Sequence, residues 1–308
     1  MKTAPGARWL PAAAALLLAA SLGCGAKKSS SDSDGNYKDI TKTFDDSEPP
    51  PEARKPVTGA DVSKLSEVDQ QRFDKLVDSL PSPCGKAHSL RTSRNNDAGC
   101  VRAPFAVDFV IALIGDGATD DEVRELYELR YGKEEPKRGF RLSDAVPHAG
   151  PGDGRVVLVE FYDYGCPACK DFAPQLKEIA QAYPTDVVIY YKQFPLASHE
   201  HSKGAAQAAL AAAKQGKFDE MHAKLFENSH AHQRERLFEY ARQIGLDMAQ
   251  FEADYVAAEA QVNADKKEGE AAGVSGTPTL YINGRMYDGP LWVKYLKMWI
   301  EEELAVNR

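Results

Sequence analysis

The stretch "RVVLVEFYDYGCPACKDFAP", residues 155–174, decides the fold. Its first half is a run of β-branched and aromatic residues, which is typical of a buried strand. A CxxC motif follows, formed by Cys166 and Cys169, with Pro167 directly after the first cysteine. Proline is common in the first turn of a helix, where its missing N–H would have had no partner. The stretch therefore predicts a strand that ends at the CxxC motif and a helix that begins there.

The residues downstream extend this pair into a larger domain. The helical spacing continues to about residue 183, and "DVVIYYKQFPL" at 186–196 predicts a second strand. A strand, helix, strand order requires two parallel strands joined by a right-handed crossover. Alanine-rich helices follow, then the strand "TPTLYING" at 277–284 and a last amphipathic helix. We expect an α/β domain over 155–308, with a helical insertion at about 197–272.

Upstream of this domain the sequence predicts a small all-helical bundle over 59–135. Apolar residues recur at helical spacing, and Thr119 with Glu122 forms a capping box at one helix start. Cys84 and Cys100 flank the loop after the first of three expected helices, so we expect a structural disulfide between them. Residues 136–154 are rich in proline and glycine and are interpreted as a linker.

The amino terminus has the features of an export signal. Residues 1–23 carry Lys2 and Arg8 and then an apolar run that is well short of the ~20 residues of a membrane span. The "SLGC" that ends at Cys24 resembles the lipobox of bacterial lipoproteins, which implies a lipid on this cysteine. Ser21 stands where leucine is usual, so ordinary cleavage without lipid is the alternative. Residues 24–58 are polar and predict a disordered tether.

The net charge and the number of cysteines indicate which partners and which compartment to expect for the protein. The formal net charge of -8 gives no basic surface for nucleic acid, so we expect no nucleic-acid partner. If Cys24 carries lipid, four cysteines remain, and an even number suits an oxidising compartment. We expect a periplasmic protein, attached through lipid to the inner or the outer bacterial membrane.

A CxxC motif can bind zinc, carry haem or exchange electrons with thiols. Zinc needs four ligands, and the nearest candidates are the pairs at 199/201 and 230/232, His199-x-His201 and His230-x-His232, in polar segments where exposed histidines are usual. Covalent haem needs a histidine after the second cysteine, and Lys170 occupies that position. We expect no metal and no cofactor.

Thiol chemistry has a direct physical basis at this position. The free N–H groups and the dipole of a helix N-terminus stabilise a thiolate on Cys166. Cys169, one turn later, is expected to be more buried and to attack a mixed disulfide formed at Cys166. The motif thus predicts a nucleophilic and a resolving cysteine.

Four separated features resemble the DsbA-like thiol-disulfide oxidoreductases, which have a thioredoxin fold with a helical insertion. They are the strand, CxxC and helix with Pro174, the carboxyl of Glu160 six residues before the first cysteine, the helical segment from "FPLASHEH" onward, and "VSGTPTLYING". The resemblance implies that Glu160 relays protons to and from Cys169. It also implies a cis bond before Pro278, with Thr277 beside the motif to hold an extended substrate.

The resemblance also implies the partners. They are protein substrates with thiols or disulfides and a membrane redox partner that resets the motif. Lys192 is a candidate neighbour of Glu160, with a solvent-exposed position as the alternative. A solvent-facing Glu160 and an ordinary trans bond before Pro278 are the alternatives for those residues.

The direction of electron flow is open. Disulfide formation is the favoured reaction; reduction or isomerisation, and a copper-binding chaperone that uses the two sulfurs, are the alternatives. Where strongly oxidising relatives have Cys-Pro-His-Cys, this chain has Ala168, and Asp163 precedes the motif. Both differences predict a less stable thiolate and a less oxidising potential.

A second resemblance concerns the bundle. "LPSPCGKAHSL" at 80–90 and "LIGDGATDDEVRELYELRYG" at 113–132 resemble the three-helix thiol domain of CcmH-type cytochrome c maturation factors. Ser82 stands where their first cysteine would fall, so their redox pair is not reproduced. The resemblance favours cytochrome c maturation as the setting for the reductase alternative.

Overall fold

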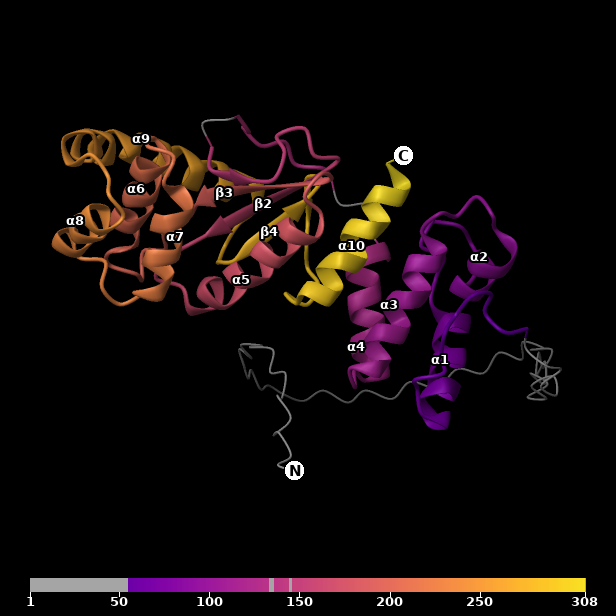
Figure 1. The fold of residues 1–308 in the computed structure, drawn as a ribbon. Coiled ribbons are helices and arrows are strands. Elements are labelled where there is room, and N and C mark those ends of the chain that lie inside the picture. Colours follow the sequence, from indigo (N-terminus) through magenta and orange to yellow (C-terminus); the bar gives the residue numbers. More distant parts are fainter. Residues whose placement is uncertain (1–54, 133–135, 144–145, 308) are drawn as a thin grey trace, which may run out of the picture. The chain divides into compact units, whose positions relative to one another are not determined.

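The computed structural model describes residues 55–132, 136–143 and 146–307 (Figure 1). The chain divides into two units, Met1–Arg54 and Lys55–Arg308, and the described residues all belong to the second. The predicted signal peptide, the lipid on Cys24 and most of the predicted tether lie outside them. Within these described ranges, no helix has the length and apolar character that a membrane span needs.

A five-stranded mixed sheet organises the carboxyl-terminal half. Its strands are β1 (His148–Ala149), β2 (Val156–Tyr162), β3 (Val187–Gln193), β4 (Thr279–Ile282) and β5 (Arg285–Met286), in the order β1-β3-β2-β4-β5. The two long strands, β2 and β3, run parallel, and β4 runs antiparallel to β2. Helix α5 (Pro167–Ala182) makes the crossover between the parallel strands, as the strand, helix, strand order predicts.

The two faces of the sheet bury alternate residues of β2. Leu158 and Tyr162 pack in one apolar cluster with α5 and with α10 (Val293–Val306), whereas Val159 and Phe161 pack in another. The second cluster contains Ala272 and apolar residues of the segment before β1. Successive side chains of a strand point to opposite faces, so each position of β2 belongs to one layer only.

Four helices lie between β3 and β4. They are α6 (Ser202–Ala213), α7 (Phe218–Glu227), α8 (Arg234–Gln243) and α9 (Met248–Ala272), and they gather beside one end of the sheet (Figure 1). The alanines of α6 let α9 approach it closely, and Ala206, Leu210, Ala258 and Val262 form a small apolar cluster between the two. This arrangement confirms the predicted α/β fold class with an inserted helical region and a preceding helical bundle.

The bundle contains one helix more than predicted within the described residues. Its helices are α1 (Glu67–Ser79), α2 (Leu90–Asn96), α3 (Ala103–Gly115) and α4 (Asp120–Tyr127), followed by a π-helical turn at Glu128–Gly132. The predicted capping box of Thr119 and Glu122 opens α4. Helix α2, "LRTSRNN", has almost no apolar periodicity; it is held by its Ser89 cap and by the burial of Leu90.

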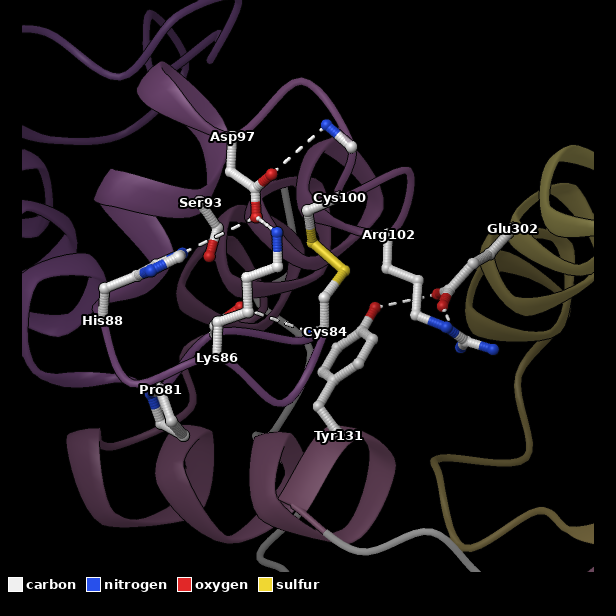
Figure 2. The surroundings of a disulfide bond; sticks show 12 residues. Pro81, Cys84, Lys86, His88, Ser93, Asp97, Cys100, Arg102, Tyr131 and Glu302 are labelled. Atoms are coloured by element: carbon white, nitrogen blue, oxygen red, sulfur yellow. Dashed lines mark hydrogen bonds and ion pairs between the residues drawn. A yellow bond between two sulfur atoms is a disulfide. The ribbon is translucent and has the colours of Figure 1, made fainter.

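Cys84 and Cys100 are joined by a disulfide across the segment that contains α2 (Figure 2). The two Cα atoms are 5.8 Å apart, and the cysteines are separated by 16 positions in the sequence. Close to this bond, Lys86 and Asp97 form an ion pair at 2.7 Å. The disulfide therefore fixes the loop that connects α1 to α3.

A buried carboxylate links the bundle to α10. Glu302 accepts hydrogen bonds from Arg102 and Arg130, each at 2.6 Å, and from the Tyr131 hydroxyl at 2.9 Å. Figure 2 shows Arg102 and Tyr131 directed toward Glu302. The guanidinium of Arg130 also lies 4.9 Å from the ring centroid of Trp299. The bundle and the last helix thus share a paired, desolvated charge.

Candidate active site

Cys166 lies where β2 gives way to α5. It is the N-cap residue of α5, with extended backbone angles, and Pro167 opens the helix. The Cys166 side chain is only 7% exposed, and that of Cys169 is fully buried. Both cysteines are free thiols, so the structure represents the dithiol state. The free N–H groups of the first helical turn therefore surround the sulfur of Cys166.

The surroundings of Cys166 stabilise its thiolate. Its pKa is lowered to about 5, chiefly by a hydrogen bond from Cys169 and further by Thr277 and by the backbone N–H groups of Cys169 and Ala168, although burial opposes the shift. When protonated, the thiol donates to the carbonyl oxygen of Thr277, with the two atoms 3.2 Å apart. At neutral pH Cys166 is mostly a thiolate.

The pKa of the Cys169 thiol is shifted in the opposite direction. Burial raises the pKa of its thiol, and its hydrogen bond to Cys166 and the charge of Glu160 add to the effect. Cys169 therefore stays protonated at neutral pH and needs a base before it can attack a disulfide. The two cysteines of one motif are thus distinguished by position alone.

Glu160 is buried below the motif, with 1% of its surface exposed. Burial, with a smaller contribution from the charge of Cys166, raises its pKa to about 8. In the described part of the chain its Oε1 atom has no hydrogen-bond partner. The alternative of a solvent-facing Glu160 is therefore wrong, and the carboxyl can hold or release a proton near neutral pH.

Lys192 follows neither sequence-based expectation. It is 2% exposed, and its Nζ lies 3.0 Å from Asp265 and 2.8 Å from Glu268. Lys192 is in register with Phe161, whereas Glu160 is in register with Tyr191. Because neighbouring positions of a strand point to opposite faces, Lys192 and Glu160 lie on different sides of the sheet.

The loop before β4 completes the site. The peptide bond between Thr277 and Pro278 is cis. The loop brings the carbonyl of Thr277 to the sulfur of Cys166 from a part of the chain more than a hundred positions away. An extended peptide that pairs with this backbone would pass directly over the nucleophile.

Asp163 has a different role from the one expected. Its buried carboxylate accepts hydrogen bonds from the backbone N–H groups of Gly165 (2.6 Å) and Leu196 (2.7 Å), from His199 Nδ1 (2.8 Å) and from the Ser202 hydroxyl. These donors compensate its charge, and Asp163 is not among the groups that shift the pKa of Cys166. Asp163 instead ties the loop before Cys166 to the start of α6.

The two histidine pairs are not arranged as a metal site. His199 is bonded to Asp163, and His232 Nε2 lies 2.9 Å from the carbonyl oxygen of Leu225. Across residues 55–132, 136–143 and 146–307, no group of three or more histidine, cysteine or acidic side chains has a geometry that could hold a metal ion. His199 is a site residue that its polar sequence context did not reveal.

A dithiol at a helix N-terminus, above a buried carboxyl and beside a cis-proline loop, defines a thiol-disulfide oxidoreductase of the DsbA-like class. A family model described as "Thioredoxin" matches residues 143–302, and the chain belongs to this family. The match spans the sheet, the CxxC motif, the inserted helices and most of α10.

Curated relatives match about half of the chain. The Na(+)/H(+) antiporter NhaA 1 of Mycobacterium sp. (strain KMS) is 34% identical over 146 residues, which are 46% of this chain and 24% of that protein. The Na(+)/H(+) antiporter NhaA 3 of Salinispora tropica is 34% identical over 163 residues, 52% of this chain and 25% of that protein. The chain therefore spans about a quarter of the length of these relatives.

Solved structures also resemble about half of the chain. A thioredoxin-like oxidoreductase from Silicibacter pomeroyi DSS-3 is 30% identical with a TM-score of 0.47, covering 51% of this chain and 91% of that one. BdbD from Bacillus subtilis is 26% identical, covers 52% and 93%, and has a TM-score of 0.47. The catalytic domain of Proteus mirabilis ScsC is 27% identical, covers 53% and 91%, and has the same TM-score.

Proposed function

We propose that this oxidoreductase forms disulfides in exported protein substrates. The observation that carries the proposal is the stabilised thiolate of Cys166, whose pKa is lowered to about 5. Stabilising the thiolate favours the reduced form of the motif, so the oxidised form passes its disulfide on more readily. Cys166 is the nucleophile that exchanges with substrate, and Cys169 is the resolving thiol.

The reaction needs no cofactor because the two sulfurs carry the electrons. A substrate thiolate attacks Cys166 in the Cys166–Cys169 disulfide, and Cys169 leaves and takes a proton from Glu160. A second substrate thiolate then attacks the substrate sulfur of the mixed disulfide and releases the Cys166 thiolate. The substrate gains a disulfide, and the protein gains two electrons and becomes the dithiol.

Resetting the motif reverses the electron flow. A disulfide-bearing membrane partner accepts the attack of Cys166, and Cys169 then gives its proton to Glu160 and resolves the mixed disulfide. Thr277 and Pro278 hold the substrate or partner segment against Cys166 in both directions. We further propose that residues 1–23 direct export and that lipid on Cys24 retains the protein at the membrane, with residues 24–58 as its tether.

The test compares two activities of the full chain. The oxidised protein is expected to catalyse the oxidative refolding of a reduced, unfolded substrate. This reaction is expected to be faster than the reduction of insulin that the protein catalyses with a small thiol as the electron donor. A Cys166→Ser variant is the control and is expected to lose both activities. Faster insulin reduction would favour the reductase alternative, and activity that survives Cys166→Ser would remove Cys166 from its role.

Two further measurements test the copper-binding alternative and the proposed lipid anchor on Cys24. Copper binding by the reduced protein, compared between wild type and Cys166→Ser, is expected to be too weak to compete with thiol exchange. Mass spectrometry of the membrane fraction is expected to find diacylglycerol on Cys24. A mature chain released to the periplasm without lipid would contradict the anchor and leave the exchange activity untouched.

A further inference from the structure

An aspartate and a histidine beside the CxxC motif form a hydrogen-bonded pair that has no part in the chemistry described so far. Asp163 directly follows β2, and His199 lies in the loop between β3 and α6. The Nδ1 atom of His199 is 2.8 Å from Oδ2 of Asp163. The Asp163 side chain is fully buried, whereas 27% of the His199 side chain is exposed. The pair therefore extends from the interior to the surface of the protein.

The hydrogen bonds of Asp163 determine which nitrogen of His199 carries a hydrogen. The carboxylate accepts from the backbone N–H groups of Gly165 and Leu196 and from the Ser202 hydroxyl, as well as from His199. A carboxylate that accepts from four donors is ionised and has no hydrogen to give. Nδ1 of His199 is therefore the donor, and in the neutral ring Nε2 keeps its lone pair. Nε2 has no hydrogen-bond partner within the described residues and is not a buried atom, so it faces solvent.

The imidazole lies against the residue that precedes the nucleophile. A Cβ atom placed on Gly165 would lie 2.9 and 3.0 Å from Cβ and Cγ of His199, so only glycine allows the ring this close. The Asp163 carboxylate accepts from the Gly165 N–H at 2.6 Å, and the Asp163 carbonyl accepts from the Cys166 N–H at 3.1 Å. One residue thus holds both the imidazole and the backbone of Cys166. His199 is not among the groups that shift the pKa of Cys166, so its ring is placed to act on a bound substrate rather than on the nucleophile.

Glu200, His201 and His232 are titratable neighbours of the pair. Glu200 and His201 follow His199 in the sequence and are exposed. Burial lowers the pKa of His232, an effect that the charge of Asp163 only partly offsets. The Nε2 atom of His232 is also occupied, 2.9 Å from a backbone carbonyl oxygen. Of these four side chains, only His199 is both oriented by a buried carboxylate and open to solvent.

We propose that His199 is the general base for substrate thiols during disulfide formation and that Asp163 positions it. The inference rests on the proposed function. Nε2 takes the proton of each substrate thiol as its sulfur attacks, first at Cys166 and then at the substrate sulfur bonded to Cys166. In the second attack the substrate disulfide forms, the bond to Cys166 breaks, and Cys166 leaves as a thiolate. The imidazolium gives each proton to water, and the two electrons that the substrate loses stay on the cysteines of the protein.

Single-turnover oxidation of a two-cysteine peptide by the oxidised full chain tests this base at pH 7 and at pH 9.5. At pH 7 only a few per cent of a free cysteine is ionised, whereas at pH 9.5 most of it is, because its pKa is about 8.5. His199→Asn keeps an N–H donor for Asp163 and removes the base. The variant is expected to be about tenfold or more slower than wild type at pH 7, toward the low end of general acid–base effects. At pH 9.5 it is expected to be within about twofold of wild type, because the thiol no longer needs a base.

His201→Asn is the matched control. His201 is an exposed histidine two positions further on, and as the N-cap residue of α6 it makes no capping hydrogen bond with its side chain. This variant is expected to stay within about twofold of wild type at both pH values, well below an acid–base effect. Glu160 also titrates between pH 7 and pH 9.5, but it is the same in every protein compared, so the ratio of variant to wild type isolates the histidine. A slow His201→Asn with a normal His199→Asn would overturn the assignment.

The same data separate this inference from the proposed function. If wild type oxidises the peptide and His199→Asn matches it at pH 7, the base is wrong and the proposed function stands. Equal slowing at both pH values would also refute the base, because it would show a structural role only. If wild type oxidises the peptide at neither pH, the proposed function itself fails. Should His199→Asn disturb the site, seen as a shifted titration of the Cys166 thiolate, His199→Gln decides: a loss confined to pH 7 supports the base, and any other result refutes it.

Discussion

Cys166 and Cys169 differ because one residue ends a loop and the other lies inside a helix. The first accepts hydrogen bonds that lower its pKa to about 5, whereas burial and the hydrogen bond that it donates to Cys166 raise the pKa of the second. Ala168 sits between them and contributes a backbone N–H but no charged side chain. The reactivity of the motif is therefore set largely by backbone geometry, which leaves position 168 free to adjust it.

Replacing Ala168 by histidine is expected to make the protein a stronger oxidant. A protonated imidazole beside Cys166 would stabilise the thiolate further. Each unit by which the pKa of Cys166 falls corresponds to roughly 30 mV in the potential of the dithiol couple. Equilibration of wild type and Ala168→His with glutathione buffers measures the change. An unchanged or lower potential in the variant would contradict this account.

Glu160 makes stability depend on pH. Its pKa is raised to about 8 in the folded chain, against about 4.3 in an unfolded one. The unfolded state therefore loses this proton first, so stability is fully present below about 4.3 and is lost as pH rises through about 8. The free energy of unfolding of the reduced protein is expected to fall over this range by roughly 1–3 kcal/mol more in wild type than in Glu160→Gln.

The comparison is made by urea unfolding at several pH values between 5 and 8.5. Cys166 gives the opposite trend: its lowered pKa adds stability above its unfolded value of about 8.5, and that stability is lost as pH falls through about 5. Cys166→Ser and Glu160→Gln therefore have to be measured separately. Parallel pH curves for Glu160→Gln and wild type would show that the carboxyl is not perturbed.

At the scale of elements, β3 and α9 are held together by a buried ion pair. Lys192 pairs with Asp265, and also with Glu268, on the face of the sheet that is remote from the cysteines. Removal of one partner leaves the other charged and desolvated, so Lys192→Ala is expected to cost about 3–5 kcal/mol of unfolding free energy. Replacing Lys192 and Asp265 together by apolar residues, Lys192→Met with Asp265→Leu, is expected to recover only part of the loss, because Glu268 then keeps Arg141 as its ion-pair partner but loses Lys192.

The position of this pair gives the experiment a second readout. Lys192 points away from Glu160, so neither variant is expected to move the titration of the Cys166 thiolate, followed by its ultraviolet absorbance. A shift in that titration would place Lys192 in electrostatic contact with the motif. The change in the free energy of unfolding by urea then reports the contribution of the ion pairs between β3 and α9.

Sequence periodicity predicted the elements that depend on local pattern. The β2–α5–β3 unit and the capping box at Thr119 follow from neighbouring residues and were found where expected. Helix α2 was missed because its seven residues are polar and depend on contacts with distant helices. The two-residue edge strands β1 and β5 are also too short to carry a pattern.

The parts of the site that could not be predicted come from tertiary contacts. His199 reaches Asp163 from a segment 36 positions away, and nothing in "SHEHS" distinguishes it from a surface histidine. The face on which Lys192 lies depends on strand register, which a strand buried on both faces does not reveal. In the sequence Tyr162 and Tyr164 resemble ordinary core aromatics; the hydrogen bond between their hydroxyls and the contact of the Tyr164 hydroxyl with His222 Nδ1 are formed only in the folded chain.

At the scale of the whole molecule, Glu302 connects the bundle with the last helix of the thioredoxin fold. Glu302→Ala would leave Arg130 without its carboxylate, although the rings of Phe109 and Trp299 still enclose it. The expected cost is about 3–5 kcal/mol of unfolding free energy. Calorimetry of the full chain is expected to show a lower melting temperature for this variant. A separate transition at lower temperature would show that the bundle unfolds independently of the thioredoxin fold.

A second variant, Arg102→Ala, tests whether the buried charge of Glu302 accounts for the loss of stability. Arg102 contacts the same carboxylate but keeps about a fifth of its side chain exposed. Arg102→Ala is therefore expected to cost less than Glu302→Ala, because water can replace part of the lost contact. Equal losses in the two variants would mean that packing of the long side chains, rather than the buried charge, holds the bundle in place.

The disulfide between Cys84 and Cys100 in the bundle must form each time a new molecule of the protein is made. A newly synthesised copy has Cys84 and Cys100 as thiols, and two electrons must be removed from them before the disulfide closes the loop around α2. Under the proposed function, that copy is itself a client of the reaction its own CxxC performs. Under that proposal, molecules that already carry the disulfide oxidise the Cys84–Cys100 pair of newly made copies.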